Sequence, residues 1–241
     1  MIREKIFPAK EGQHSHGFRL RGHEVQRIET FSDAVFAFAV TLLIVSLEVP
    51  KSFDDLLISM RGFFAFAICF TLLMLIWYEQ NVFFRRYALD DTWTVLLNSM
   101  LIFIVLFYVY PLKFLFSLVF GDMIFGAGKN PFSIREAQVP YLFVIYGLGY
   151  FFIYLIFFLL YRHALRRRGH LQLSPLEVFD TKTKLYAQLA MVVIGICAVI
   201  LALALPPKLA GLWGMWYFVI PPAIWLVHGR RAVIRKRIKA A

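Results

Sequence analysis

Long apolar runs alternate with shorter polar segments along the whole chain. Each run is close to the length that an α-helix needs to cross the hydrocarbon core of a bilayer, roughly 20 residues. The pattern therefore predicts an all-α integral membrane protein. It divides the chain into a basic arm, 1–27, a transmembrane domain, 28–230, and a basic tail, 231–241. Six transmembrane helices are expected, at about 28–48, 57–78, 93–120, 139–161, 185–205 and 212–228.

Capping and helix-breaking residues mark several of the expected helix ends. Asp90-Asp91-Thr92 offers side chains that cap the third span, and Pro111 and Lys113 inside that span predict a kink or a water-facing end. Ser174-Pro175-Leu176-Glu177 has the pattern of an N-cap, a first-turn proline and a capping-box glutamate. It predicts a short interfacial helix, with an ordinary polar loop as the alternative. Pro206-Pro207 is expected to end the fifth span, and Pro221-Pro222 to bend or break the sixth.

The composition supports the membrane assignment. Hydrophobic residues make up 60% of the chain and charged residues 17%, whereas average globular domains have about 45–50% and about 25%. This balance excludes a disordered chain, a disulfide-stapled secreted domain and a soluble nucleic-acid-binding protein. Cys69 and Cys197 lie inside apolar runs without ligand-spaced partners, so we interpret both as small buried hydrophobic residues.

The basic residues predict the orientation in the membrane. Twenty of the 26 Lys and Arg residues lie in the arm, the tail and the loops after spans two and four, which all fall on one side. By the positive-inside rule that side is cytoplasmic, so both termini are expected in the cytoplasm and the protein in the cell membrane. The net charge of +11 then sets topology and does not indicate a nucleic-acid partner. Arg166-Arg167-Arg168 is interpreted as a topological anchor, with binding of acidic lipid headgroups as the alternative.

Signatures of enzymes and metal sites are missing from the sequence. Gly126-Ala127-Gly128-Lys129 lacks the spacing of a phosphate-binding loop, and His14-Ser15-His16 has no Cys nearby and does not have the spacing of a metal-ligand set. No Ser, Cys or Thr is spaced for nucleophilic catalysis beside a His or an acid. We therefore predict a protein that is not an enzyme and holds no cofactor or resident metal.

The first span carries an ionisable residue, Asp33, close to its start. Such a residue is costly inside a membrane and needs a partner or water. At 100° per residue, Asp33 and Phe38 are about 140° apart on the helix. One stripe holds Phe31, Ala34, Phe38, Thr41, Leu42 and Val45, and another holds Asp33, Ala37, Val40 and Ile44. If the Phe38 stripe lines a pathway, Asp33 points into neighbouring helices as a structural pin. Periodicity alone favours simple helix packing for the Phe38 stripe.

The segment Arg27-x-x-x-Phe31-Ser32-Asp33 resembles the first-helix signature of the potassium channel family typified by the lysosomal transmembrane protein 175. The chain is similar to the single-repeat prokaryotic members of that family. Further similarities are Trp77, Phe84, Leu97-Asn98 and Tyr110-Pro111-Leu112. Two histidines often follow the tryptophan in the family, and here Gln80 and Asn81 stand in their place.

The resemblance implies a homotetramer in the lipid bilayer, with the first helices surrounding a central pore for K⁺. It places the narrowest ring at Phe38, a bulky aromatic residue where the family has an aliphatic one, with further apolar lining from Leu42 and Val45. It places a hydroxyl layer for selectivity at Thr41. The network that holds the pore helix is then made by Arg27, Phe31, Ser32, Asp33, Trp77 and Asn98. A ring of four phenylalanines is a hydrophobic constriction of the kind that gates by dewetting.

Two other interpretations remain open from the sequence. In the first, the chain is a secondary transporter in which Asp33 carries a proton or cation and Pro221-Pro222 marks a broken helix. In the second, it is a non-conducting membrane scaffold that binds partners through its basic tails. Potassium-selective passive conduction is the function that the first-helix motif favours.

Overall fold

Five long helices make up most of the chain in the computed structural model, which describes residues 14–15, 18–22, 24–45, 51–121, 134–206, 214–227, 229 and 231. The long helices are α1 (Arg27–Val45), α2 (Phe53–Tyr87), α3 (Thr92–Val119), α5 (Val139–Arg166) and α6 (Pro175–Ala204). Short 3-10 helices occur at η2 (Glu136–Gln138) and η4 (Trp216–Val219), and two short strands, β1 (His14–Ser15) and β2 (Phe18–Arg19), pair antiparallel. The predicted all-α class is confirmed.

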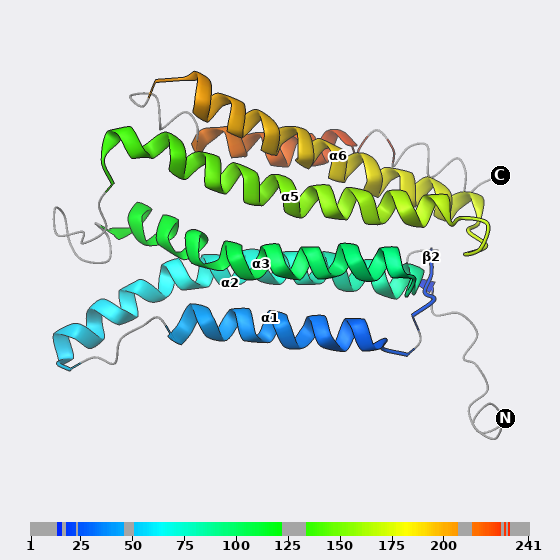
Figure 1. Ribbon diagram of the computed structural model, residues 1–241, viewed down its shortest axis with the longest axis horizontal. Helices are drawn as coiled ribbons and strands as arrows, with labels where there is room; N and C mark the ends of the chain where they lie inside the picture. Colours follow the sequence, from blue (N-terminus) through cyan, green and yellow to red (C-terminus); the bar gives the residue numbers. More distant parts are fainter. Residues whose placement is uncertain are drawn as a thin grey trace.

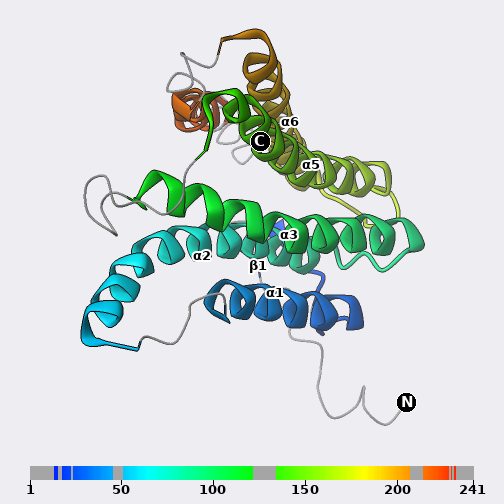
Figure 2. The same ribbon diagram turned by 60° about the vertical axis from the view of Figure 1, so that its left-hand side comes forward.

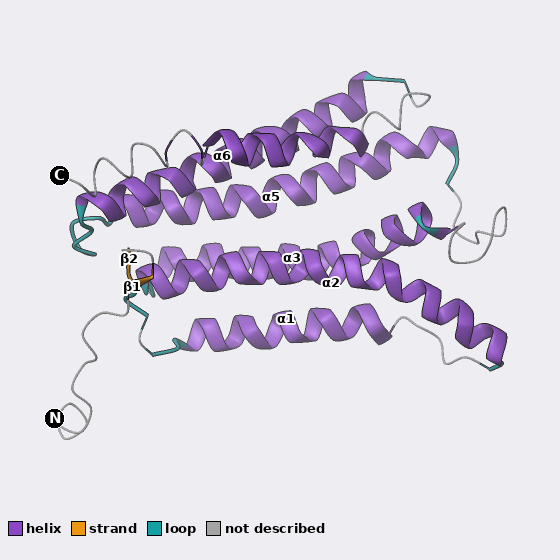
Figure 3. Cartoon of the chain, turned by 180° about the vertical axis from the view of Figure 1, so that it is seen from behind, coloured by secondary structure: helices purple, strands orange, loops and turns teal. Residues whose placement is uncertain are grey.

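The long helices form two packed groups. In Figure 1, α1, α2 and α3 lie side by side in one group, and α5 and α6 pair in the other. α3 joins the groups by packing against α5, while α1 packs against α2 and α3. Figure 2 shows that the groups lie closest together near the turn between α5 and α6 and diverge towards the opposite end. Figure 3 shows β1 and β2 at the end of the bundle where α2 finishes.

Local sequence signals explain where several helices begin and end. Asp91 is the N-cap of α3, and its carboxylate accepts a hydrogen bond from the Thr94 N–H at 3.2 Å. Ser174 caps α6. In the capping box, the Ser174 N–H donates to the Glu177 carboxylate at 2.9 Å. α6 ends at Ala204, directly ahead of the proline pair. α3 continues through Pro111 to Val119.

Three helices extend beyond the predicted spans, and α5 does so by running from Val139 to Arg166. α2 continues through Glu79 and Gln80 to Tyr87, because both polar side chains find hydrogen-bonding partners on neighbouring helices. α6 starts at Pro175 and runs without interruption, so the separate interfacial helix predicted after Ser174 is wrong. The capping box is present as expected, but it starts the long helix itself.

Four of the described helices are long and apolar enough to cross a membrane: Gly62–Tyr87, Thr92–Val119, Glu136–Arg166 and Pro175–Ala204. A shorter apolar helical stretch, Trp216–Val227, overlaps the predicted sixth span. Its 3-10 turn comes before Pro221-Pro222, and the two prolines lie in the α-helical residues that follow. The segment 126–129 and the tail 232–241 lie outside the described residues.

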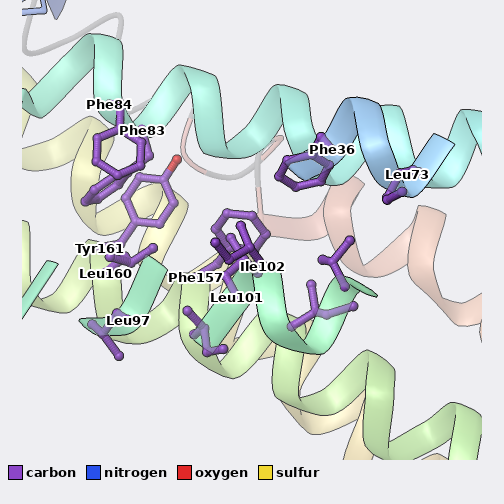
Figure 4. Packing of buried hydrophobic residues seen from close by; sticks show 14 of the residues in the cluster. Phe36, Leu73, Phe83, Phe84, Leu97, Leu101, Ile102, Phe157, Leu160 and Tyr161 are labelled. Carbon is purple, nitrogen blue, oxygen red and sulfur yellow. The ribbon is translucent and has the colours of Figure 1, made fainter. Parts of the chain in front are cut away.

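The core is richest in aromatic side chains between α2 and α5. Phe83, Tyr87 and Tyr161 are almost fully buried, and their rings meet edge to face or tilted at centroid distances of 5.1–6.0 Å. Figure 4 shows this cluster continuing along the bundle through Phe157 and Leu101. Cys69 is buried as predicted, whereas Cys197 is only half-buried, and both are free thiols.

Candidate functional site

α1 has one buried and one exposed face. Ser32, Phe36, Ala39 and Leu43 are all at most 4% exposed and pack against the neighbouring helices. On the other side, the predicted stripe is accessible: Phe31 is 60% and Phe38 is 57% exposed, and Ala34 and Thr41 are exposed as well. The exposed arc also includes Asp33 and Ala37, so it is wider than the stripe that the sequence defines.

A buried chain of hydrogen bonds joins α1 to α3 and α2. The Asn98 amide donates to the Ser32 hydroxyl at 2.7 Å, and the Gln80 amide donates to the Asn98 carbonyl oxygen at 2.5 Å. The Ser32 hydroxyl in turn donates to the Ile28 carbonyl at 2.7 Å. All three side chains are at most 2% exposed. Buried polar groups need such partners, so this chain fixes how α1 sits on the other two helices.

Asp33 has a partner on α2. The Trp77 indole N–H donates to its carboxylate at 2.7 Å. Both residues line a groove of about 320 Å³ between α1 and α2, together with Phe36, Ala37, Val40, Leu73 and Met74. A charge-assisted hydrogen bond of this length is stronger than a neutral one, and it directs the Asp33 side chain towards α2.

The remaining predicted site residues occupy different positions. The Thr41 hydroxyl donates to the Phe38 carbonyl of its own helix at 2.7 Å. Leu42 is half-buried, and the Val45 side chain lies outside the described residues. Arg27 and Phe31 have exposed side chains, and in the described part of the chain neither joins the hydrogen bonds that hold α1.

Sequence reasoning did not assign Gln80 to this network. In the sequence it stands only in place of a histidine that is common in the resembling family. Its position, three residues after Trp77, places it on the same side of α2. A polar amide that directly follows the apolar run of a span is the signal that indicates its role, because such a group requires a partner when buried.

Lys113 of α3 holds the far end of α1. Its ammonium group donates to the Leu43 carbonyl at 2.9 Å, in the last turn of α1. The last carbonyls of a helix lack partners within the helix and attract positive charge. α1 is therefore held to α3 near both ends, by Asn98 and by Lys113.

Glu79 joins the two helix groups. Its carboxylate accepts hydrogen bonds from the Tyr161 hydroxyl of α5 at 2.8 Å, from the Lys184 ammonium of α6 at 2.8 Å, and from the Gln188 amide at 3.0 Å. The side chain is only 18% exposed. A carboxylate is tolerated at this depth because every partner compensates for lost hydration. The sequence places Glu79 only at the polar end of a span.

A second polar contact joins α3 to α5 at the N-terminus of α3. Asp91 accepts hydrogen bonds from Thr94, pairs with the His163 ring at 2.6 Å and contacts Arg167 at 3.3 Å. Burial alone would raise the pKa of this carboxyl group, but the bonds from Thr94 and His163 outweigh burial and hold the pKa below its usual 3.8. Asp91 is therefore both a helix cap and an ion-pair partner.

Comparison with known proteins identifies the family. The sequence model of one protein family, described as endosomal/lysosomal potassium channel TMEM175, matches residues 27–108. A potassium channel from Marivirga tractuosa is 42% identical over 236 residues, which cover 94% of each chain. A potassium channel from Chamaesiphon minutus is 31% identical over 96 residues, or 36% of this chain and 47% of its own.

A solved structure supports the same assignment. The crystal structure of a threonine-to-alanine variant of the potassium channel MtTMEM175, in complex with a nanobody–MBP fusion protein, matches with a TM-score of 0.80 and 40% identity. The match covers 91% of this chain and 98% of that one. The family expected from the first-helix motif is confirmed, and it is a family of channels rather than enzymes. The chain belongs to the family of the endosomal/lysosomal potassium channel TMEM175.

Proposed function

We propose that four copies of this chain form a potassium channel in the cell membrane, with the α1 helices around a central pore that conducts K⁺ passively. Each subunit crosses the membrane six times and keeps both termini in the cytoplasm. The observation that carries the proposal is the exposed face of α1, which presents Phe38 and Thr41 while the opposite face is buried.

The arrangement of basic residues supports the orientation. Arg21 contacts the backbone at Arg86 and Gln172, so the arm, the end of α2 and the segment after α5 lie at one end of the bundle. These are three of the segments in which the positive charge concentrates. Their common position at one end is what the positive-inside rule requires of a cytoplasmic face.

The exposed arc of α1 is wide enough for two neighbours. In a four-fold assembly, the Phe38 and Thr41 stripe faces the central axis. The strip with Asp33 and Ala37, beside the groove shared with α2, faces the adjacent subunit. The Ser32–Asn98–Gln80 chain and the Asp33–Trp77 bond then hold each α1 at a fixed rotation, so that the four Phe38 rings meet at one level.

Phe38 and Thr41 have different roles in this pore. Four phenyl rings form a hydrophobic constriction that excludes water unless the rings separate. One helical turn away, four Thr41 hydroxyls offer oxygen atoms that replace part of the hydration shell of K⁺. The Thr41 hydroxyl donates a hydrogen bond to the Phe38 carbonyl. The lone pairs of the Thr41 oxygen therefore stay available to a cation.

The constriction is tested by K⁺ flux through purified protein in liposomes. F38A is compared with F103A. Phe103 on α3 is also exposed, and both substitutions replace a phenyl ring with a hydrogen, leaving the methyl side chain of alanine. We expect F38A to change K⁺ flux and F103A to leave it near the wild-type value. Equal flux in wild type, F38A and F103A would remove Phe38 from the pore. Saturating flux that is coupled to an ion gradient would favour the transporter interpretation.

The selectivity layer is tested by the permeability ratio of K⁺ to Na⁺. T41V is compared with T71V, because Thr71 on α2 is exposed and its hydroxyl makes the same kind of bond, to the Ala67 carbonyl at 2.8 Å. We expect T41V to lower the ratio and T71V to preserve it. An unchanged ratio in T41V would refute the selectivity role.

A further inference from the structure

The segment 18–22, which we call the strap, lies at the end of the bundle just before α1. Phe18 is 1% exposed and its ring meets that of Tyr87 edge to face at 5.6 Å. The Arg86 guanidinium lies 5.0 Å from the centre of the same ring. The sequence places these residues in the basic arm, but the strap contains a buried aromatic side chain, Phe18. Only contacts distant in sequence reveal it.

Arg21 is the most extensively bonded side chain of the strap. Its guanidinium binds both carboxylate oxygens of Glu177 on α6, at 3.1 and 2.8 Å, and donates to the Leu171 carbonyl at 3.0 Å. The Arg21 side chain is 10% exposed and that of Glu177 is 4% exposed. Glu177 also accepts the Arg19 N–H at 2.9 Å. A bidentate, shielded pair of this kind fixes both distance and angle.

The strap backbone is fixed to α2 as well. The N–H groups of Arg21 and Gly22 both donate to the Arg85 carbonyl at 3.1 Å. A Cβ atom at Gly22 would lie 3.1 Å from the Arg85 Cα and from the Phe84 carbonyl oxygen, so glycine permits this close approach. The strap is thus fastened to the end of α2 and, through Arg21, to the start of α6.

Two strained backbone positions lie where the strap and the residues that follow it contact the rest of the bundle. Among the described non-glycine residues, Ala88 and Gln172 have positive φ angles, of 46° and 48°. The Ala88 carbonyl accepts the Gln26 amide at 3.1 Å, and the Gln172 carbonyl accepts Arg21 at 3.4 Å. Left-handed conformations cost energy for such residues and persist where surrounding contacts hold them. Both carbonyls therefore face the segment that leads into α1.

We propose that Arg21 is a positioning residue for conduction, because its pair with Glu177 fixes the start of α1 relative to α5 and α6. This inference rests on the proposed function, in which α1 lines the pore. α1 itself packs on α2 and α3, while α6 contacts β2 of the strap. Movements of α5 and α6 reach the pore helix through the strap. Without the Arg21–Glu177 ion pair, the four α1 helices lose their common alignment.

The test measures K⁺ flux per assembled channel in liposomes for R21Q, E177Q and the double variant. R19Q is the matched control, because Arg19 lies two residues before Arg21 in the strap and its side chain is exposed. R21Q and E177Q are expected to lower flux about fivefold or more while the K⁺ to Na⁺ ratio stays at the wild-type value. The double variant is expected to be no worse than either single variant, and R21K to restore part of the flux.

Flux in R21Q and E177Q equal to that of R19Q would overturn the proposal, even if their melting temperatures fall, since the pair would then be structural only. If R21Q does not assemble, E177Q decides, because glutamine keeps an oxygen that accepts the Ser174 N–H of the capping box. Loss of flux in R21Q with no effect of F38A would reject Phe38 in the pore and leave the strap coupling intact. A change of flux in F38A with no loss of flux in R21Q would reject the strap coupling and leave Phe38 in the pore.

Discussion

Replacing Asn98 with alanine tests the buried chain that holds α1. N98A removes the bonds to Ser32 and Gln80, and hydrogen bonds between membrane helices average about 0.6 kcal/mol each. It also leaves the Gln80 amide, 2% exposed, without its Asn98 acceptor, at a cost of about 1–3 kcal/mol. Together these effects predict a loss of about 2–4 kcal/mol in the free energy of unfolding. For a chain of this size, that corresponds to a melting temperature lower by about 5–15 °C.

The assay is thermal unfolding of purified protein in one detergent, followed by circular dichroism. S99A is the control, because Ser99 is the next residue on α3, is exposed, and donates only to the Val95 carbonyl of its own helix. Its expected effect is within about 0.5 kcal/mol. S32A should fall between the two, because of the bonds between helices it removes only the one from Asn98 and it keeps the Gln80–Asn98 pair. A melting temperature of N98A equal to that of S99A would show that the buried bonds of Asn98 do not stabilise the position of α1.

Three further substitutions have definite expected outcomes. Because the folded-state pKa of Asp91 is lowered, its stabilising contribution is complete above the unfolded value and is lost as the pH falls below 3.8 through the folded pKa. D91N should therefore flatten the acid side of a plot of melting temperature against pH, and an unchanged acid slope would contradict this. G149A places a Cβ against the Tyr108 ring and should cost about 1–3 kcal/mol. G62A meets open space and should gain about 0.5–1 kcal/mol, so equal melting temperatures for the two glycine variants would disprove this packing.

Local signals in the sequence predict much of the helical framework. The acidic cap at Asp91, the capping box at Ser174 and the proline after α6 all act within one helical turn, and the structure contains each of them. The first-helix motif identifies the family, and the Ser32, Asp33, Trp77 and Asn98 side chains all take part in the hydrogen bonds that hold α1.

The features that the sequence does not reveal depend on distant contacts. α2 extends through Glu79 because that carboxylate binds Tyr161 and Lys184, more than 80 residues away. The strap folds onto the bundle because Arg21 reaches Glu177, 156 residues along the chain. Such pairs follow no local periodicity, since hydrophobic patterning reports which face of a helix is buried but not which polar groups meet there.

Cysteine accessibility during conduction decides whether α1 lines a potassium pore. F38C and F103C channels are exposed to a membrane-impermeant thiol reagent while K⁺ current is recorded, with the wild type as the control for Cys69 and Cys197. A cysteine inside the pore places the bulky adduct in the path of the ion. We predict rapid, irreversible block of F38C and no block of F103C or the wild type. Persistent K⁺ current through F38C after its thiol has demonstrably reacted would show that Phe38 does not line the pore.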